Sequence, residues 1–199
     1  MKAFWDERYQ QKEYVYGTQP NLFLEQNLGA WSEKGMILFP CEGEGRNAVF
    51  AAKSGWEVHA FDFSESGKSK ALRLAEMESV NISYSLADAL DFDFGREKYD
   101  VIAFIFAHFP PDVRSEIHSR AIHSLKPGGR IIIEAFNPNQ LKNESGGPKD
   151  ISMLYTKEML QSDFEGMDIE LLETAEIHLR EGKYHEGHAD VIRLVATKK

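Results

Sequence analysis

The strongest indication of the fold lies in residues 37–52, which read ILFPCEGEGRNAVFAA. An apolar run ends at Pro40, a glycine turn with two glutamates follows, and a stretch of small residues suited to a helix begins directly after it. A strand, a tight glycine turn and a helix in this order are typical of ligand-binding loops in open α/β sheets. Such loops often hold phosphates, so the carboxylates of Glu42 and Glu44 in this turn need an explanation.

Apolar runs suited to strands recur along the chain and alternate with helical stretches. The expected strands cover residues 36–39, 57–61, 82–86, 101–106 and 130–135. The expected helices cover residues 47–54, about 64–79 with Ser64 as the N-cap, and the stretch that follows Pro111 and stops at Pro127-Gly128-Gly129. Repeated strand–helix–strand units predict a parallel sheet with helices on both faces.

The C-terminal third has a different pattern. Thr156 is suited to cap a short helix over residues 157–162, and two strand-like runs follow at 171–179 and 189–197. The short link between them, REGKYHEGH, favours a hairpin over a crossover helix. The sequence therefore predicts a doubly wound, Rossmann-like α/β fold with a seven-stranded sheet, mostly parallel with an antiparallel last strand.

Length, charge and cysteine content restrict the class of protein. The 199 residues suggest a single domain over 1–199, with an N-terminal segment, 1–30, packed on it. A net charge of −9 argues against a nucleic-acid partner, which needs a basic surface. One cysteine excludes an intrachain disulfide and suits a reducing compartment. No signal peptide or membrane span is apparent, so we expect a cytoplasmic protein without a membrane partner.

The glycine turn and the acid that follows it indicate a nucleoside cofactor. Asp62 ends the second strand 17 residues after Gly45, a spacing at which an acid can accept hydrogen bonds from ribose hydroxyls. The segment GEGRNA also matches the dinucleotide fingerprint, but Glu42 and Glu44 would repel a pyrophosphate. S-adenosylmethionine is cationic and carries no phosphate, so it suits these carboxylates better. In an alternative interpretation, both carboxylates point to water.

The chain resembles the class I S-adenosylmethionine-dependent methyltransferases, and more narrowly their small tellurite-resistance and thiopurine type. The segments that carry the resemblance are ILFPCEGEGRNAVFAA, EVHAFDFS, LADAL, YDVIAFIFAHFPP and HSLKPGGRIIIEAF, with YVYGTQPN and YHEGHADVIRLVA nearer the ends. The family loop usually reads acid-x-Gly-x-Gly-x-Gly. Here Phe39 stands at the acid and Cys41 at the first glycine, and Glu42 is the candidate to replace the lost carboxylate in part.

The resemblance implies a role for particular residues. It assigns the methionine part of the cofactor to Gly43 and Gly45, the ribose to Asp62 and the adenine to Phe63, Asp88 and Ala89. It places Phe106 and His108 beside the reacting methyl group. It also implies that the N-terminal segment closes over the cofactor through Tyr16, with Arg8 as a partner for the cofactor carboxylate.

Methyl transfer from a sulfonium needs little more than an aligned nucleophile, so we expect a soft small-molecule acceptor such as a thiol, selenium or tellurium species. A hydroxyl or amine would need a base, for which His108 is the first candidate. In the alternative, His108 is only hydrogen-bonded to backbone. His185 and His188 come next, over the site or solvated at the hairpin tip. They do not make a metal site without further ligands.

Two other functions fit the same pattern. One is an NAD(P)-dependent oxidoreductase on a similar sheet, which predicts parallel strands at the C-terminus. The other is a cofactor-binding homologue without catalytic activity, suggested by Phe39 and Cys41. The sequence leaves the acceptor and the oligomeric state open.

Overall fold

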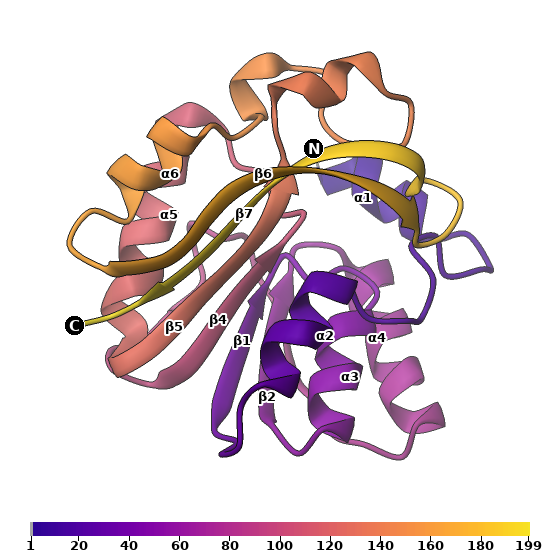
Figure 1. Ribbon diagram of the computed structural model, residues 1–199. Coiled ribbons are helices and arrows are strands. Elements are labelled where there is room, and N and C mark those ends of the chain that lie inside the picture. Colours follow the sequence, from indigo (N-terminus) through magenta and orange to yellow (C-terminus); the bar gives the residue numbers. More distant parts are fainter. Residues whose placement is uncertain (1) are drawn as a thin grey trace.

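The computed structural model describes residues 2–199 and the side chains of residues 3–199, so the first residue of the expected segment 1–30 lies outside it. Within these residues a seven-stranded sheet has the order β3-β2-β1-β4-β5-β7-β6 (Figure 1). The strands are β1 Met36–Pro40, β2 Glu57–Asp62, β3 Ser83–Leu86, β4 Tyr99–Ile105, β5 Leu125–Phe136, β6 Asp168–Arg180 and β7 Glu186–Thr197.

The strand directions confirm the predicted fold class. β1 pairs in parallel with β2 and β4, and β4 pairs in parallel with β5. β7 is antiparallel to both β5 and β6. It runs antiparallel to β6 because the connection between these two strands is too short for a crossover helix. The antiparallel β7 differs from the parallel C-terminal strands that the oxidoreductase alternative predicted. Strand order reverses between β1 and β4, where open α/β sheets bind their ligands.

Helices cover both faces of the sheet. They are α1 Lys2–Tyr9, α2 Leu22–Gly29, α3 Arg46–Lys53, α4 Glu65–Met77, α5 Pro111–Ser124 and α6 Lys157–Asp163, with 3-10 turns η1 Pro138–Lys142 and η2 Ile151–Met153. α2, α3 and α4 lie on one face, and α5 and α6 lie on the other (Figure 1). Each face has its own apolar core, with Leu24 and Phe39 in the first and Ile117 and Phe164 in the second.

The predicted helix caps are confirmed. The Ser64 hydroxyl accepts a hydrogen bond from the Gly67 N–H at 3.1 Å, and the Thr156 hydroxyl accepts one from the Met159 N–H at 3.3 Å. Side-chain oxygens at these positions satisfy backbone donors that have no partner within the helix. The start of α4 is thereby fixed directly after Asp62, at the edge that carries the candidate site.

The start of the fifth strand was predicted too late. β5 begins at Leu125 and not at Arg130, and Pro127-Gly128-Gly129 forms an irregular part of the strand where the register against β4 shifts. A side chain at Gly129 would lie 3.1 Å from the Tyr99 carbonyl oxygen, so glycine lets the two backbones approach. The turn-forming residues therefore mark a bulge and not the end of pairing.

The N-terminal helix and the C-terminal hairpin meet at the carboxyl edge of the sheet. α1 lies beside the tip of the β6–β7 hairpin (Figure 1), where the Gln11 amide donates a hydrogen bond to the Tyr184 hydroxyl at 3.0 Å. None of the helices in residues 2–199 combines the length and the apolar character that crossing a bilayer requires.

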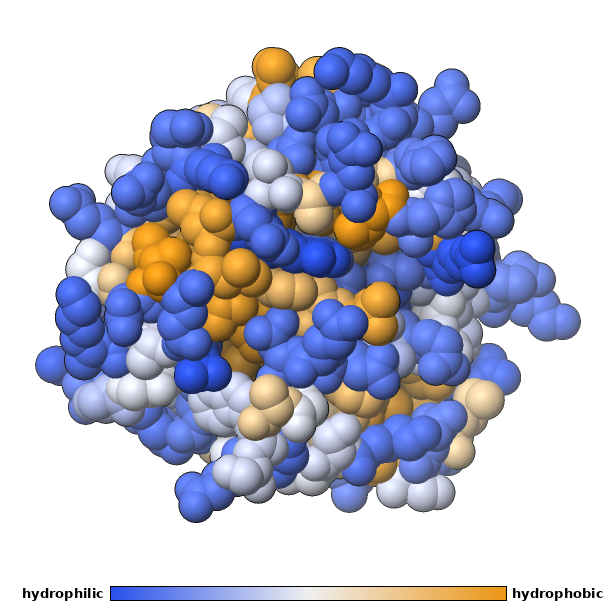
Figure 2. Space-filling model, in the orientation of Figure 1, coloured by the Kyte–Doolittle hydropathy of each residue, from blue (hydrophilic) through white to orange (hydrophobic). Residues whose placement is uncertain are grey.

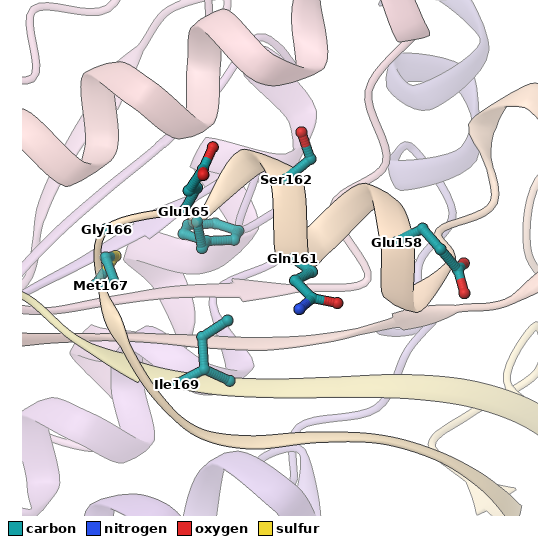
Figure 3. A pocket seen from close by; sticks show the side chains of 8 residues that line it. Glu158, Gln161, Ser162, Glu165, Gly166, Met167 and Ile169 are labelled. Carbon is teal, nitrogen blue, oxygen red and sulfur yellow. The ribbon is translucent and has the colours of Figure 1, made fainter.

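A shallow hollow lies elsewhere, between α6 and the start of β6 (Figure 3). Its lining includes Glu158, Gln161, Met167 and Ile169. Apolar side chains gather on this side of the molecule (Figure 2). Ile169 pairs with Ala196 near the end of the sheet where the parallel strands begin, so the hollow is separate from their carboxyl ends.

Candidate active site

The turn after β1 has a left-handed backbone at three positions. Cys41, Gly43 and Gly45 have φ values of 56°, 63° and 87°. A residue with a β-carbon is uncommon in this region, so Cys41 has a conformation that is usually occupied by glycine. The turn is joined to β2 by a hydrogen bond from the Glu42 N–H to the Phe61 carbonyl at 3.1 Å.

Asp62 connects the end of β2 to this turn. Its carboxylate accepts hydrogen bonds from the Gly43 N–H at 3.1 Å and from the Ser64 N–H at 2.8 Å. Burial raises the pKa of Asp62 to about 6 despite these bonds. Burial also raises the pKa of the Cys41 thiol, and the carboxylates of Asp62 and Asp88 add to that effect. Acidic groups from the ends of β2 and β3 therefore converge on the turn after β1.

The two glutamates of the turn do not point to water, so that interpretation is wrong. Glu44 is 4% exposed, accepts a hydrogen bond from the Val15 N–H at 2.8 Å and forms an ion pair with Lys70. Glu42 accepts hydrogen bonds from the N–H groups of Asn47 and Ala48 at the start of α3. Its pKa is raised to about 7 by burial, which these hydrogen bonds only partly offset. Glu44 ties the N-terminal segment to the turn, and Glu42 caps a helix.

The glycines of the turn are required by neighbouring protein atoms. A β-carbon at Gly45 would lie 2.5 Å from the β-carbon of Ala71, so this glycine lets α3 pack closely against α4. The Cβ side of Gly45 thus faces a helix, so a contact with the methionine part of a cofactor would involve the backbone of this residue. A β-carbon at Gly43 would lie 2.5 Å from the hydroxyl oxygen of Tyr9.

Tyr9, which the resemblance did not assign to the cofactor, also lies at the candidate site. It is buried, it covers Gly43, and burial together with the charge of Asp62 raises its pKa. Trp5 stacks on Tyr9 with ring centroids 5.5 Å apart. Two aromatic residues four positions apart occupy one face of a helix, and that spacing is the signal that could have identified Tyr9.

Tyr16, the residue expected to contact the cofactor, lies between α1 and the hairpin tip. Its ring centroid is 4.5 Å from that of His185, and its hydroxyl accepts a hydrogen bond from Arg8 at 2.9 Å. Arg8 therefore already has a partner within the N-terminal segment. The hairpin tip is packed against the site, so the interpretation of His185 as a solvated residue is wrong, whereas His188 is exposed.

The remaining expected adenine contacts lie at the ends of β2 and β3. Phe63 is half-buried directly after Asp62, and Ala89 is 5% exposed. Asp88 is exposed, and one of its carboxylate oxygens accepts a hydrogen bond from the Leu90 N–H at 3.1 Å. The second carboxylate oxygen accepts no hydrogen bond from the described residues, so Asp88 can still accept a hydrogen bond from a ligand.

Phe106 follows directly after β4 and has an unusual backbone conformation. Its φ is 53°, and its N–H donates to the Glu134 carbonyl at 2.7 Å. A bulky residue with positive φ is strained, and such strain is often found at functional sites. The Phe106 ring packs on Phe136 and His185, with centroids 4.6 Å away in each case. An aromatic wall therefore stands at the strand end expected to lie beside the reacting methyl.

His108 has no free ring nitrogen. Its Nδ1 lies 2.7 Å from the Met153 carbonyl oxygen, and its Nε2 accepts a hydrogen bond from the Phe136 N–H at 3.2 Å. Burial lowers the pKa of His108 to about 4. This geometry favours the alternative of a histidine that holds backbone in place over a role for His108 as a base.

Comparisons with known proteins point to methyltransferases. Residues 37–129 match the family model of a methyltransferase domain. The chain is 29% identical over 127 residues to phosphoethanolamine N-methyltransferase 2 of Caenorhabditis elegans, a match that covers 60% of this chain. It spans only 28% of that relative's length.

Solved structures with the same fold include a protein studied for the conversion of a disulfide bond into a thioacetal group during echinomycin biosynthesis. That match has a TM-score of 0.82 at 16% identity and covers 100% of this chain and 92% of the other. TehB from Haemophilus influenzae matches with a TM-score of 0.73 at 17% identity, covering 100% of this chain and 67% of TehB. The two solved structures share the fold of this chain at low sequence identity, and the match to the methyltransferase domain model is confined to residues 37–129.

Proposed function

We propose that the protein transfers a methyl group from S-adenosylmethionine to a small-molecule acceptor. The observation that carries this proposal is the desolvated carboxylate of Asp62, which lies against the glycine turn at the switch point of the sheet. A buried carboxylate whose pKa is raised by burial gains most from a ligand that brings hydroxyl donors and positive charge. A sulfonium nucleoside supplies both, whereas a pyrophosphate adds like charge.

The described residues fit this cofactor when each is assigned to one part of it. Asp62 holds the ribose hydroxyls, and Phe63, Asp88 and Ala89 hold the adenine. Tyr9 and Tyr16, with the backbone of the turn around Gly43 and Gly45, hold the methionine part, and Phe106 lies toward the methyl group. Glu42 and Glu44 support the cofactor site indirectly. Glu42 fixes the start of α3, and Glu44 fixes the N-terminal segment. When bound, the cofactor supplies the electrophilic methyl group.

The acceptor in this proposal is a soft nucleophile, such as a thiol or a selenium or tellurium species. The likeness to the protein studied for the conversion of a disulfide bond into a thioacetal supports a sulfur acceptor. The curated relative is named for an amine acceptor, phosphoethanolamine, and an amine is therefore the second class to test.

Isothermal titration with S-adenosylmethionine and S-adenosylhomocysteine tests the cofactor, and NADH fluorescence on mixing tests the oxidoreductase alternative. A radiolabelled-methyl transfer screen over thiols, selenite, tellurite, thiopurines and phosphoethanolamine then tests the reaction. We expect micromolar binding of both sulfur nucleosides and transfer to at least one soft acceptor. Absence of binding at millimolar ligand would refute the proposal, and binding without transfer would support a homologue that lacks activity.

A further inference from the structure

The hairpin tip between β6 and β7 is built to hold one histidine. Within it, the Glu181 N–H donates to the His185 carbonyl at 2.9 Å, and the His185 N–H donates to the Gly182 carbonyl at 3.0 Å. A β-carbon at Gly182 would lie 2.7 Å from the Val15 carbonyl oxygen, so the turn packs directly on the N-terminal segment. The backbone of His185 is therefore fixed from both sides.

The His185 ring lies inside an aromatic cup at the end of β4. Its centroid is 4.5 Å from Tyr16, 4.6 Å from Phe106 and 5.5 Å from Phe136. The residue is 6% exposed. Phe106 is the strained residue at the strand end where the proposed reaction takes place, so the imidazole stands on the acceptor side of the candidate site.

Buried charges hold one ring nitrogen of His185. Its Nδ1 lies 3.3 Å from a carboxylate oxygen of Glu181, and that oxygen also forms an ion pair of 2.8 Å with Arg46. The other Glu181 oxygen accepts a hydrogen bond from the Asn21 amide at 3.2 Å. Burial alone would raise the pKa of Glu181, but His185 and Arg46 bring it to about 2. An ionised Glu181 therefore selects the tautomer with the proton on Nδ1.

The second ring nitrogen, Nε2, is left with a free lone pair. None of the described residues forms a hydrogen bond with this nitrogen. The fully buried side-chain atoms without a partner among the described residues are Trp56 Nε1 and His118 Nε2, so His185 Nε2 is not one of them and is not fully buried. Gly146 packs beside this edge of the ring, where a β-carbon would lie 2.8 Å from His185 Cδ2 and 3.2 Å from Nε2, so a side chain at this position would crowd the nitrogen. His108, by contrast, has both nitrogens occupied.

We propose that His185 is the general base of the reaction, that it removes the proton of a neutral thiol or related X–H acceptor, and that Glu181 is its positioning residue. This inference rests on the proposed methyl transfer. The acceptor atom forms its bond to the methyl carbon as its proton passes to Nε2. The methyl–sulfur bond breaks with its electron pair on sulfur, and the imidazolium then returns the proton to water. The apolar cup suits an acceptor without charge.

The charges around His185 set the pH at which it works. Glu181 from the hairpin faces Nδ1, Arg46 from α3 and Arg8 from α1 add positive charge, and His108 lies near enough to interact. Burial has the largest effect on the pKa of His185 and lowers it below its usual value. Arg46 and Arg8 also lower this pKa, whereas Glu181 raises it and so opposes them. The imidazole is consequently neutral and able to accept a proton at pH 7.

The test is kcat/KM against pH with β-mercaptoethanol, an alkanethiol that is protonated at neutral pH, for the wild type, His185→Gln and Glu181→Gln, with the exposed His188→Gln as the matched control. Tellurite, which reacts through a lone pair on tellurium and needs no proton removed from that atom, serves as the second acceptor. We expect His185→Gln to lower β-mercaptoethanol turnover by ~10²- to 10⁴-fold and to abolish the acidic limb of the profile. Glu181→Gln should shift that limb, and His188→Gln should change neither.

Each possible failure has its own readout. A wild type that binds no S-adenosylhomocysteine overturns the proposed function, whereas normal binding and transfer with an unchanged pH profile in His185→Gln overturns only this inference. Equal losses with β-mercaptoethanol and tellurite would show a structural role for His185. If the variant does not fold, ¹⁵N NMR of the wild-type histidines decides, since the proposal requires His185 with Nδ1 protonated and Nε2 bare at pH 7.

Discussion

The Glu44 carboxylate accepts a hydrogen bond from the Val15 N–H at 2.8 Å, although 29 residues separate the two in sequence. The same carboxylate pairs with Lys70 of α4, and the side chains of Glu44 and Lys70 are 3% and 14% exposed. One glutamate of the glycine turn thus joins three parts of the chain: the N-terminal segment, the turn and α4. Glu44 therefore holds the N-terminal segment in place as a cover over the candidate site.

Replacement of Glu44 should loosen this cover. We expect Glu44→Ala to lower the free energy of unfolding by about 3 kcal/mol, because it leaves the Lys70 ammonium and the Val15 N–H without their partner. Glu44→Gln keeps an acceptor for Val15 and should lose less. Urea unfolding measures the stability, and limited proteolysis near residues 10–20 measures the release of the segment. Equal protease resistance in wild type and Glu44→Ala would contradict this role.

Gly45 should not tolerate a methyl group. Its φ of 87° and the 2.5 Å approach to Ala71 mean that Gly45→Ala strains the backbone and pushes α3 from α4. We expect a loss of about 3 kcal/mol or more in the free energy of unfolding. Gly29→Ala is the control, since a β-carbon there meets nothing within 4 Å, and its effect should stay within about 1 kcal/mol. Thermal and urea unfolding of both variants provide the comparison.

His108 should prove structural. Because both of its ring nitrogens bond to backbone, we expect His108→Gln to lower the free energy of unfolding by about 2 kcal/mol. The shape of the pH profile of kcat/KM should not change in the molecules that remain folded. Methyl-transfer assays from pH 5 to 9, normalised to the folded fraction, test this. Loss of the acidic limb in this variant, with the fold retained, would restore His108 as the base.

The fold was predictable from sequence because its signals are local. Caps at Ser64 and Thr156, the apolar strand over 101–106 and the short link between the last two strands each follow from neighbouring residues. The candidate site was only partly predictable, because its decisive contacts join distant segments. Nothing near Glu44 in sequence points to Val15, and nothing near His108 points to Met153 or Phe136. Only tertiary packing decides which histidine keeps a free nitrogen.

Glu42 should make stability depend on pH. The pKa of Glu42 in the folded protein, about 7, lies above the ordinary value of 4.5, so its contribution to stability is fully present below pH 4.5 and is lost as pH rises through 7. We expect Glu42→Gln, which keeps an acceptor for Asn47 and Ala48, to gain on the order of 2 kcal/mol relative to wild type between pH 5 and pH 8. Urea unfolding across this range measures the difference. The exposed substitution Glu76→Gln is the control, and parallel curves for wild type and Glu42→Gln would contradict the prediction.

Asp62 should control cofactor affinity and its pH dependence. Asp62→Ala removes the carboxylate proposed to hold the ribose, so we expect S-adenosylhomocysteine to bind at least ~10-fold more weakly, a loss of about 1.4 kcal/mol or more. In the wild type, the ionised form must bind the hydroxyls. Because the free protein holds the pKa of Asp62 at about 6, affinity should fall as pH decreases through 6.

Isothermal titration of wild type, Asp62→Ala and the exposed control Asp91→Ala at pH 5 and pH 7.5 tests both statements. Asp91→Ala should retain the wild-type affinity and pH dependence. Asp62→Ala should bind weakly at both pH values with little difference between them, since the titrating group is gone. Wild-type affinity in Asp62→Ala would place the nucleoside elsewhere in the molecule. An unchanged pH dependence with reduced affinity would assign the titration to a different group, with Glu42 next in line because its pKa is also raised by burial.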